Sequence, residues 1–287
     1  MTLKRAILVV LVCWFALACM AGCFVEDSVK VNGHMRHLVM YLPDGVRQDA
    51  PVVFVLHGYG AGIWRENPMV ATADRYGFAV CIPEGLRDPQ GERSWNVGYP
   101  FQEGWQVDDV KALCRMARHV QKRYHLSREN TFLTGMSNGG EMCYLMAYSK
   151  QNTFKAVAPI AGLTMAWMYE HMDAPRPIPL MEIHGTEDRV SEWTGDLENN
   201  GGWGAYLPVP IAIGYWVAKN RCTSEQVERV ESIQGQEGHP IIKHRYSGST
   251  TGCEVWLYEV VGGVHSWFTS DMNTGEEIWQ FFARYIK

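Results

Sequence analysis

The sequence lacks the features that mark several large classes of protein. It has no long run of lysine or arginine and no acidic tail, and its formal net charge is -5, so the composition gives no indication of a nucleic-acid partner. No Cys-x-x-Cys pair occurs, which leaves a zinc-ribbon site without support, and no repeat or low-complexity linker divides the chain. What is present is 287 residues that are 47% hydrophobic, which is enough to bury the core of one α/β domain.

The longest apolar run lies at the start of the chain. Lys4 and Arg5 precede an apolar stretch over residues 6–20, and small residues follow, which predicts a signal peptide over residues 1–22. The alternative is a retained membrane anchor, because the run is close to the shortest that spans a bilayer. Met20-Ala21-Gly22-Cys23 resembles the cleavage box of bacterial lipoproteins, although Met20 stands where leucine is usual. We therefore expect export, to the cell envelope or beyond, with a lipid on Cys23 as the only membrane attachment.

Export changes the interpretation of the cysteines, because disulfides persist outside the cytoplasm. Five cysteines follow Cys23, and an odd number leaves at least one of them unpaired. Cys222 and Cys253 flank the region of the last predicted strands, and we expect a disulfide between them. Cys81, Cys114 and Cys143 fall in apolar strand or helix segments, where a free cysteine behaves as a small hydrophobic residue.

Short apolar segments alternate with helical patterns along the rest of the chain. An apolar stripe of period 3.6 predicts a helix over residues 107–124, and shorter patterns predict helices over 141–147 and over 274–285, the last opening with a capping box at Thr274 and Glu277. The alternation predicts an α/β fold with a mainly parallel sheet, helices on both faces and one domain over residues 23–287. The predicted strands cover residues 36–42, 51–56, 78–82, 131–134, 156–160, 179–183 and 254–261.

The most informative motif is Gly135-Met136-Ser137-Asn138-Gly139, between a predicted strand and a predicted helix. A nucleophile on such a tight turn needs small neighbours, because the backbone folds back on itself. This motif predicts Ser137 as the nucleophile and the backbone N–H of Asn138 as an oxyanion donor. A second donor is expected from the loop after an early strand, where we favour the N–H of Tyr59. The glycines at 58, 60 and 62 do not have the spacing of a dinucleotide-binding loop.

A serine nucleophile requires a base and an acid that orients the base. His265 follows the last predicted strand, behind Gly262 and Gly263, which allow the loop to reach the serine. Asp188 follows another strand and is the expected acid, with Glu187 as its rival, and His184 is expected to be structural. The order serine, aspartate, histidine is the order found in α/β hydrolases.

Six motifs occur together and in one order along the chain: His57-Gly-Tyr-Gly60, Ser94-Trp-Asn96, Val107-Asp-Asp-Val110, Gly135-Met-Ser-Asn-Gly-Gly140, His184-Gly-Thr-Glu-Asp188 and Gly262-Gly-Val-His-Ser-Trp267. Taken together, these motifs resemble the polyhydroxybutyrate depolymerase and feruloyl esterase family of secreted esterases. The resemblance implies an α/β-hydrolase fold, a triad of Ser137, Asp188 and His265, and no metal or organic cofactor. It implies an ester substrate, either polyester, feruloyl or acetyl esters of plant xylan, or small esters.

Substrate selection is the most open part of the interpretation. Trp95 and Trp267 lie near the motif residues, and we expect them to form an aromatic subsite, with core packing as the alternative. Residues 190–210 are rich in Asn, Gly and Trp, depart from the family pattern, and follow the expected acid, so they are placed to overhang the site. Two other functions share the same sequence features: a serine peptidase on this fold, and a carbohydrate-binding surface lipoprotein without catalysis.

Overall fold

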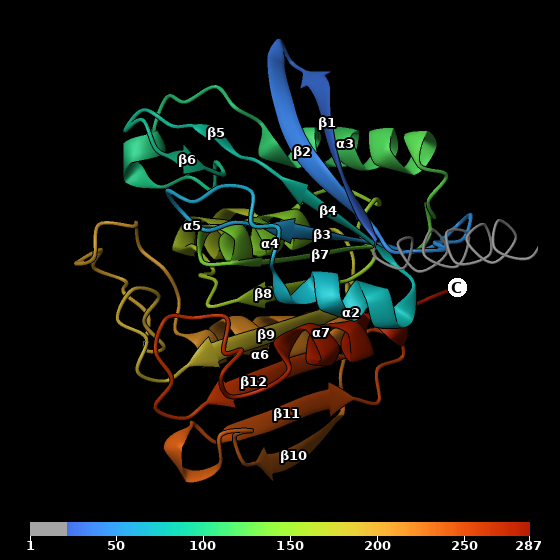
Figure 1. The fold of residues 1–287 in the computed structure, drawn as a ribbon. Helices are drawn as coiled ribbons and strands as arrows, with labels where there is room; N and C mark the ends of the chain where they lie inside the picture. The colour runs from blue at the N-terminus through green and yellow to red at the C-terminus, as the bar shows by residue number, and fades with distance from the viewer. Residues whose placement is uncertain (1–21) are drawn as a thin grey trace, which may run out of the picture.

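A ten-stranded sheet organises the chain (Figure 1). This computed structural model describes residues 22–287, so the predicted signal peptide, apart from Gly22, lies outside the described residues. Two further short strands, β5 (Leu86–Arg87) and β6 (Arg93–Ser94), pair with each other. In order across the large sheet, the strands are β1 (Cys23–Val31), β2 (His34–Leu42), β4 (Ala79–Pro83), β3 (Val52–Leu56), β7 (Thr131–Met136), β8 (Val157–Ile160), β9 (Leu180–Gly185), β12 (Val255–Val260), β11 (Ile241–Ser247) and β10 (Ser224–Val230).

The central strands, from β4 across to β12, are parallel, whereas the two strands at each edge are antiparallel to their neighbours. Most residues of the parallel strands are apolar, although β7 contains two threonines and β9 contains Glu182 and His184, and every residue of β3 is buried. Strands that are covered on both faces require such runs, which is why the sequence predicted all of them. The predicted mainly parallel α/β architecture is confirmed.

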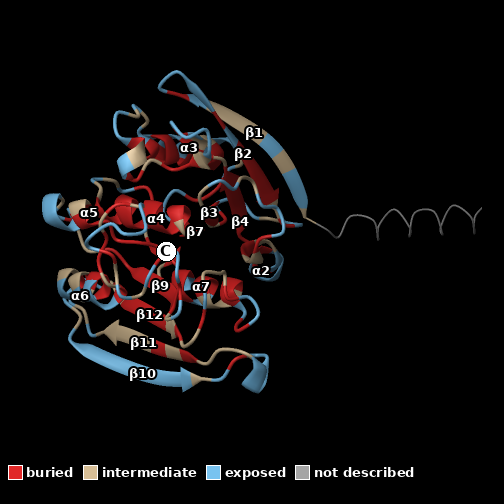
Figure 2. Ribbon diagram, turned by 90° about the vertical axis from the view of Figure 1, so that its left-hand side faces the viewer, coloured by how far each residue is buried: buried red, intermediate tan, exposed pale blue. Residues whose placement is uncertain are grey.

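Helices cover both faces of the sheet, and on each face they pack against it to form a separate hydrophobic core (Figure 2). One core contains α3 (Asp109–Arg123), α4 (Asn138–Tyr148), α5 (Ala166–His171) and α6 (Val209–Asn220), and the other contains α2 (Pro68–Tyr76) and α7 (Thr274–Ala283). Two short 3-10 helices, η1 (Pro100–Gln102) and η2 (Gly235–Glu237), lie in loops. Because side chains alternate along a strand, Phe54 enters the first core and Val53 and Val55 enter the second.

The helix over residues 107–124 is confirmed as α3, and the carboxylate of Asp108 accepts a hydrogen bond from the Lys111 N–H at 2.8 Å. The C-terminal helix is also confirmed, but the capping box predicted for it is wrong. Asn273 is the N-cap residue, and the Thr274 hydroxyl donates to the carbonyl oxygen of Trp267 at 2.7 Å. Thr274 therefore secures the preceding loop instead of capping the helix, while the Glu277 carboxylate binds Lys243 at 2.8 Å.

The predicted disulfide between Cys222 and Cys253 is not formed, because both residues are free thiols in the structure. The Cys222 Sγ lies 3.6 Å from the carbonyl oxygen of Cys253, so the two residues are neighbours. The Cys253 Sγ instead approaches the carbonyl oxygen of Thr251 at 3.8 Å, within its own turn. Cys81, Cys114 and Cys143 are buried and free, as predicted.

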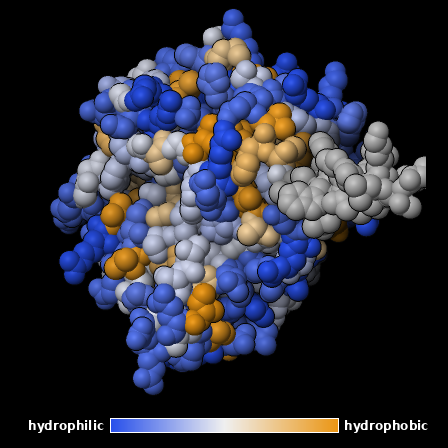
Figure 3. Space-filling view, in the orientation of Figure 1, coloured by the Kyte–Doolittle hydropathy of each residue, from blue (hydrophilic) through white to orange (hydrophobic). Residues whose placement is uncertain are grey.

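The outer edges of the sheet are more polar than its centre. Nearly every residue of β10 is exposed, and β1 mixes exposed and half-buried residues (Figure 2). The face seen in Figure 3 is mostly hydrophilic, with small separate hydrophobic groups. Within residues 22–287, no helix has the length and apolar character needed to cross a bilayer.

Candidate active site

Ser137 stands at the turn between β7 and the first residue of α4, with φ 56° and ψ −125°. A positive φ is unfavourable for a residue with a Cβ and marks a strained turn. The Ser137 N–H donates to the carbonyl oxygen of Ile160 at 2.9 Å, which ties the turn to the end of β8. A Cβ on Gly139 would lie 2.6 Å from the carbonyl oxygen of Leu56, so only glycine fits beside this serine. The serine consequently sits at the amino end of α4, where the helix dipole favours negative charge.

His265 and Asp188 meet across the loops that follow β12 and β9. The Nδ1 of His265 lies 2.7 Å from the Oδ2 of Asp188, and the other oxygen, Oδ1, accepts the N–H groups of Val190 and Ser191, each at 2.8 Å. Burial by itself raises the pKa of Asp188. The hydrogen bond and charge of His265 and the two N–H donors lower it by more than burial raises it, so its pKa lies below the ordinary value. Asp188 therefore carries a negative charge that faces the imidazole.

Backbone contacts hold these two loops together. The Gly262 N–H donates to the Thr186 hydroxyl at 2.8 Å, and the Glu187 N–H donates to the carbonyl oxygen of Gly263 at 3.0 Å. A Cβ on Gly185 would lie 2.2 Å from that same oxygen, so the loops approach as closely as backbone atoms allow. Glu187 is exposed, whereas Asp188 is buried and faces the ring, so the geometry favours Asp188 of the two carboxylates.

His184 is buried below Asp188 and supports its turn. Its Nε2–H donates to the carbonyl oxygen of Ser191 at 2.7 Å, and its Nδ1 lies 2.8 Å from the Oε1 of Glu182, which also accepts the Gly162 N–H at 3.2 Å. Burial alone would lower the pKa of His184, but the hydrogen bond and charge of Glu182 raise it above the ordinary value. Together, His184 and Glu182 therefore link Gly162, just after β8, to the turn that binds Asp188. The prediction that His184 is structural agrees with this arrangement.

His57 is engaged on both ring nitrogens. Its Nδ1–H donates to the carbonyl oxygen of Gly58 at 2.7 Å, and its Nε2 accepts the Gly85 N–H at 2.9 Å. Burial lowers the pKa of His57 to about 4, so the ring is neutral at physiological pH. Because both of its nitrogens are hydrogen bonded to backbone, His57 holds the loop after β3 in place and cannot accept a proton from Ser137. His265 is the other imidazole that lines the pocket with Ser137.

The two expected oxyanion donors flank the serine. Asn138 follows Ser137 as the first residue of α4, where backbone N–H groups have no partner within the helix. On the other side, a Cβ on Gly58 would lie 3.4 Å from the Cβ of Ser137, which places the backbone that leads into Tyr59 against the serine. Backbone of Asn138 and of the segment that leads into Tyr59 therefore lies beside Ser137.

Trp95 does not line a subsite, so that prediction is wrong. Its side chain is fully buried, and its indole N–H donates to the carbonyl oxygen of His57 at 3.0 Å. The Trp95 N–H donates to the Oδ1 of Asn138 at 2.7 Å, and the Nδ2 of Asn138 returns a bond to the Trp95 carbonyl oxygen at 3.1 Å. Trp95 thus supports both loops beside Ser137 from beneath.

Trp267 does border the pocket beside Ser137, as predicted, and its partner there is Trp64, which the sequence analysis missed. The two indole rings lie edge to face, with centroids 5.5 Å apart. The pocket has a volume of about 330 Å³ and an apolar wall, with Ser137 and His265 both at its surface. Its further lining residues are Val55, Leu56, His57, Gly58, Tyr59, Ala61, Gly62, Ile82 and Met136.

The segment after Asp188 reaches the other side of the serine. Val190, Ser191 and Trp203 border a narrow void that Ser137 also lines, and Trp203 contacts the ring of Tyr59 with centroids 5.4 Å apart. In Figure 1 this segment, yellow to gold, extends beyond the carboxyl end of β9. The expectation that residues 190–210 overhang the site agrees with these contacts.

A buried carboxyl group, which the sequence analysis did not single out, lies behind the same void. Glu141 is fully buried in the first turn of α4 and is hydrogen bonded to the hydroxyl of Tyr99. Burial raises the pKa of Glu141 to about 8. Hydrogen bonds from Tyr99 and Asn138 favour the charged form and lower the pKa, but burial has the larger effect. Glu141 is therefore mostly protonated at neutral pH. Over residues 22–287, no group of three or more His, Cys, Asp or Glu side chains is arranged to hold a metal ion.

A parallel sheet with a serine on the turn after β7, an aspartate after β9 and a histidine after β12 defines an α/β hydrolase. The family model for Esterase PHB depolymerase matches residues 37–239, and the chain belongs to this family. The predicted family is therefore confirmed, and the chain is a carboxylic ester hydrolase.

Individual relatives are distant. The chain is 25% identical over 284 residues to feruloyl esterase D of Neurospora crassa, covering 90% of this chain and 85% of that protein. It is 26% identical over 169 residues to the bifunctional acetylxylan esterase/xylanase XynS20E of Neocallimastix patriciarum, covering 58% of this chain but only 23% of that longer protein. An acetyl xylan esterase from Aspergillus awamori has a similar structure, with a TM-score of 0.65, 13% identity and coverage of 92% of this chain and 100% of that one. At that identity, the likeness shows the shared α/β-hydrolase fold.

Proposed function

We propose that this chain is an exported serine esterase that forms an acyl-enzyme on Ser137. The observation that carries the proposal is the 2.7 Å contact between His265 Nδ1 and Asp188 Oδ2, in a ring whose pocket also contains Ser137. An aspartate on Nδ1 keeps the other nitrogen, Nε2, free to take a proton. Among the described residues, the other imidazole that lines this pocket is His57, and both of its nitrogens are already hydrogen bonded.

The reaction follows from these positions. His265 Nε2 removes the Ser137 proton as Oγ attacks the ester carbonyl carbon, and the resulting oxyanion is bound by the N–H groups of Asn138 and Tyr59. The protonated ring then donates its proton to the departing alkoxide, and the alcohol leaves. A water molecule, deprotonated by the same ring, attacks the acyl-serine, and the ring returns that proton to Ser137 Oγ as the acid is released. Asp188 stays ionised throughout and stabilises the imidazolium.

The pocket favours an aromatic or otherwise apolar group on the substrate. Trp64, Trp267 and Tyr59 provide flat apolar surface beside the serine, and few polar groups line the pocket. This supports feruloyl esters of plant polysaccharide, as the name of one relative suggests, with acetyl esters and hydroxyalkanoate polyesters as the related alternatives. No cofactor takes part in the proposed steps.

Export is proposed from the same chain. We infer that residues 1–22 are removed, that Cys23 carries a lipid, and that residues 23–287 are one catalytic domain. Cys23 is exposed and is the first residue of β1, which runs in the same direction as β4. Cys23 therefore lies beside the amino ends of the parallel strands, whereas Ser137 lies at their carboxyl ends (Figure 1). A membrane anchor there would leave the pocket facing away from the lipid. The intact mass of the protein from its host tests this directly: an acylated Cys23 is expected, and an unmodified start at Met1 would refute it.

A substrate panel tests the function. The full chain and Ser137→Ala are compared on methyl ferulate, an acetylated xylo-oligosaccharide, a 3-hydroxybutyrate oligomer and a peptide anilide. We expect turnover of at least one ester by the wild type alone, with the ferulate preferred. Cleavage of the peptide without any ester would make the chain a peptidase, and binding of the sugar without turnover would make it a carbohydrate-binding protein.

A further inference from the structure

A basic hollow extends along the outer side of α3, and no step of the proposed reaction uses it. It consists of two adjoining depressions of about 610 and 560 Å³ that share the side chains of Arg115, Arg118, Asn152 and Thr153. The walls are α3, the end of β1, and the loops around residues 128–129 and 150–155. The hollow is therefore continuous and formed by segments that are far apart in the sequence.

The hollow gathers positive charge on a chain that is negative overall. Against a formal net charge of -5 for the chain, its walls contain eight lysine or arginine side chains and only two carboxylates, those of Asp108 and Glu129. The eight are Lys30, Lys111, Arg115, Arg118, Lys122, Arg128, Lys150 and Lys155. Such a concentration of one sign creates a local potential that attracts anions.

Most of these cations have no acidic partner among the described residues. Within residues 22–287, the Lys155 ammonium pairs with Glu129 at 3.6 Å, and no side-chain nitrogen of the other seven lies within 4.0 Å of a carboxylate. Lys111, Arg115, Arg118 and Lys122 recur every three or four residues, so they share one face of α3. Like charges at this spacing oppose helix formation, and an anion bound between them would remove that repulsion.

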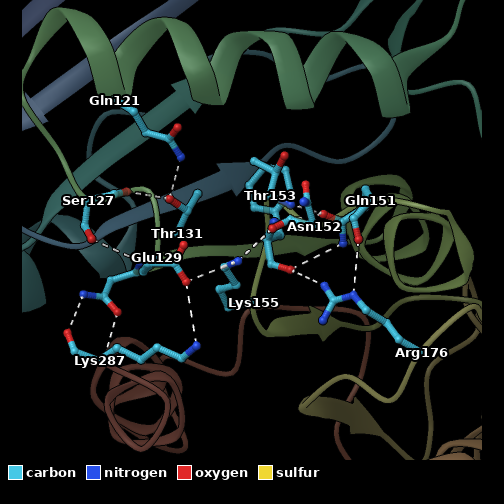
Figure 4. Close-up of polar contacts among 12 residues, drawn as sticks. Gln121, Ser127, Glu129, Thr131, Gln151, Asn152, Thr153, Lys155, Arg176 and Lys287 are labelled. Carbon is cyan, nitrogen blue, oxygen red and sulfur yellow. Dashed lines mark hydrogen bonds and ion pairs between the residues drawn. The ribbon is translucent and has the colours of Figure 1, made fainter.

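The wall opposite α3 is fixed by internal hydrogen bonds (Figure 4). The Oε1 of Gln151 accepts the N–H groups of Thr153 and Phe154 at 2.8 and 2.9 Å, and the Arg176 guanidinium donates to the carbonyl oxygens of Gln151 and Phe154. Lys155 donates to the carbonyl oxygen of Asn152 at 2.9 Å. The loop that presents Asn152 and Thr153 to the hollow is thus already ordered before any ligand binds.

We propose that this hollow binds an acidic polysaccharide, a sugar chain with carboxylate or sulfate groups along its length. The charged face of α3 from Asp108 to Lys122 is about 21 Å long, which matches several sugar units in a row. Arginine forms paired hydrogen bonds with carboxylate and sulfate oxygens, and Asn152 and Thr153 are suited to hydroxyl groups. The site would hold an acidic matrix near the enzyme without taking part in hydrolysis.

Two other polyanions fit this site less well. The described residues that line the hollow include no Phe, Tyr or Trp, and the one imidazole among them, His119, is paired with Asp27 at 2.9 Å, whereas single-stranded nucleic acids are held largely by stacking on aromatic rings. A flat lipid surface would meet the rim of the hollow and leave much of the charge in its walls unused. A rod-like sugar chain contacts both walls at once.

Binding to de-esterified oligogalacturonate tests the proposal, because this ligand has carboxylates but no ester for Ser137 to cleave. Titration calorimetry compares the full chain with Arg115→Glu/Arg118→Glu and with the control Arg47→Glu/Arg229→Glu, which reverses two exposed arginines outside the hollow. We expect the first pair to weaken binding at least about tenfold, the control to stay within about twofold, and about 0.5 M salt to abolish binding through screening. Turnover of a small ester should be unchanged in all variants. Lys122→Glu/Lys150→Glu replaces the first pair if that variant does not fold.

Heparin oligosaccharide, neutral xylo-oligosaccharide and phosphatidylglycerol vesicles complete the experiment. Binding of heparin alone, with the same dependence on Arg115 and Arg118, supports the site and identifies sulfate as its anion. Equal affinity in the charge-reversal and control variants, or binding of the vesicles but of neither acidic sugar, overturns the proposal. Loss of ester turnover would leave this result unaffected, so failure here and failure of the proposed esterase function are distinguishable.

Discussion

Asp188 and His265 are 77 residues apart in the chain, yet the carboxylate of one lies 2.7 Å from the imidazole of the other. The strands that precede them, β9 and β12, are parallel neighbours, so their carboxyl ends release both loops at the same edge of the sheet. The turn after β9 then fixes Asp188 through two backbone N–H groups and leaves one oxygen to face the ring. The fold therefore supplies the geometry of the pair before any substrate arrives.

Asp188→Asn should lower kcat by about 10⁴-fold, because an amide stabilises the wrong tautomer of the imidazole and cannot balance its positive charge. Steady-state kinetics on a small chromogenic ester measure the loss. The matched control is Glu187→Gln, an exposed carboxylate one residue away, which should stay within a few-fold of the wild type. The reverse ranking would make Glu187 the orienting acid.

Glu182→Gln should destabilise the protein by about 3 kcal/mol, because it removes the anion that partners a buried imidazole. Loss of this support also loosens the turn that binds Asp188, so kcat should fall while KM for a small ester changes little. Chemical denaturation and kinetics on the same preparation provide both numbers. Glu192→Gln, at an exposed position, is the control, and a stability equal to that of the control would contradict the support assigned to Glu182.

Glu141 makes the stability of the protein depend on pH. Its folded-state pKa of about 8 lies above the ordinary value of 4.5, so the unfolded chain loses this proton at a lower pH than the folded protein does. The free energy of unfolding therefore decreases as the pH rises from 4.5 to about 8. Glu141→Gln cannot ionise, and its stability relative to the wild type should therefore increase between pH 5 and pH 8, by about 4 kcal/mol at most.

Melting curves across this pH range measure the effect of Glu141→Gln, with Glu192→Gln again as the control. A stability difference that is the same at pH 5 and pH 8 would mean that Glu141 is already ionised in the folded protein. The pH dependence separates this effect from any change in packing, which would be constant across the range.

Trp64→Ala and Trp267→Ala should each lower kcat/KM on methyl ferulate by roughly fivefold, as expected for the loss of about 1 kcal/mol of ring contact, and should affect a minimal acetate ester less. Trp95→Ala should instead destabilise the fold by about 3–5 kcal/mol, because this side chain is fully buried. Kinetics and melting temperatures for the three variants decide. Equal losses of kcat/KM on both esters for Trp64→Ala and Trp267→Ala would contradict the assignment of these two residues to an aromatic subsite.

The sequence predicted the centre of the sheet and missed much of its rim. Strands such as β3 are fully buried and appear as short apolar runs rich in β-branched residues, and this length and composition favour a strand over a helix. By contrast, β10 is exposed along nearly its whole length, so its residues have no apolar pattern to reveal a strand. Its pairing with β11 depends on contacts that a single segment of sequence does not contain.

The same difference applies to the site. Ser137 and its glycines are recognisable because one local turn demands them, whereas Trp95 and Trp64 depend on how loops fold back. Trp95 lies in a loop near the serine, as its position suggested, but its ring turns inward to the carbonyl oxygen of His57. Trp64 reaches the pocket through its contact with Trp267, from a part of the chain with no motif. Side-chain direction in a long loop is set by tertiary contacts.

Labelling with a fluorophosphonate probe, followed by mass spectrometry of the modified peptide, tests the central claim most directly. The probe phosphonylates only a serine activated by a neighbouring base, so the account predicts one adduct, on Ser137, that is absent in Ser137→Ala and strongly reduced in His265→Ala. An adduct on another residue, or undiminished ester turnover by Ser137→Ala, would contradict the assignment of Ser137 as the nucleophile.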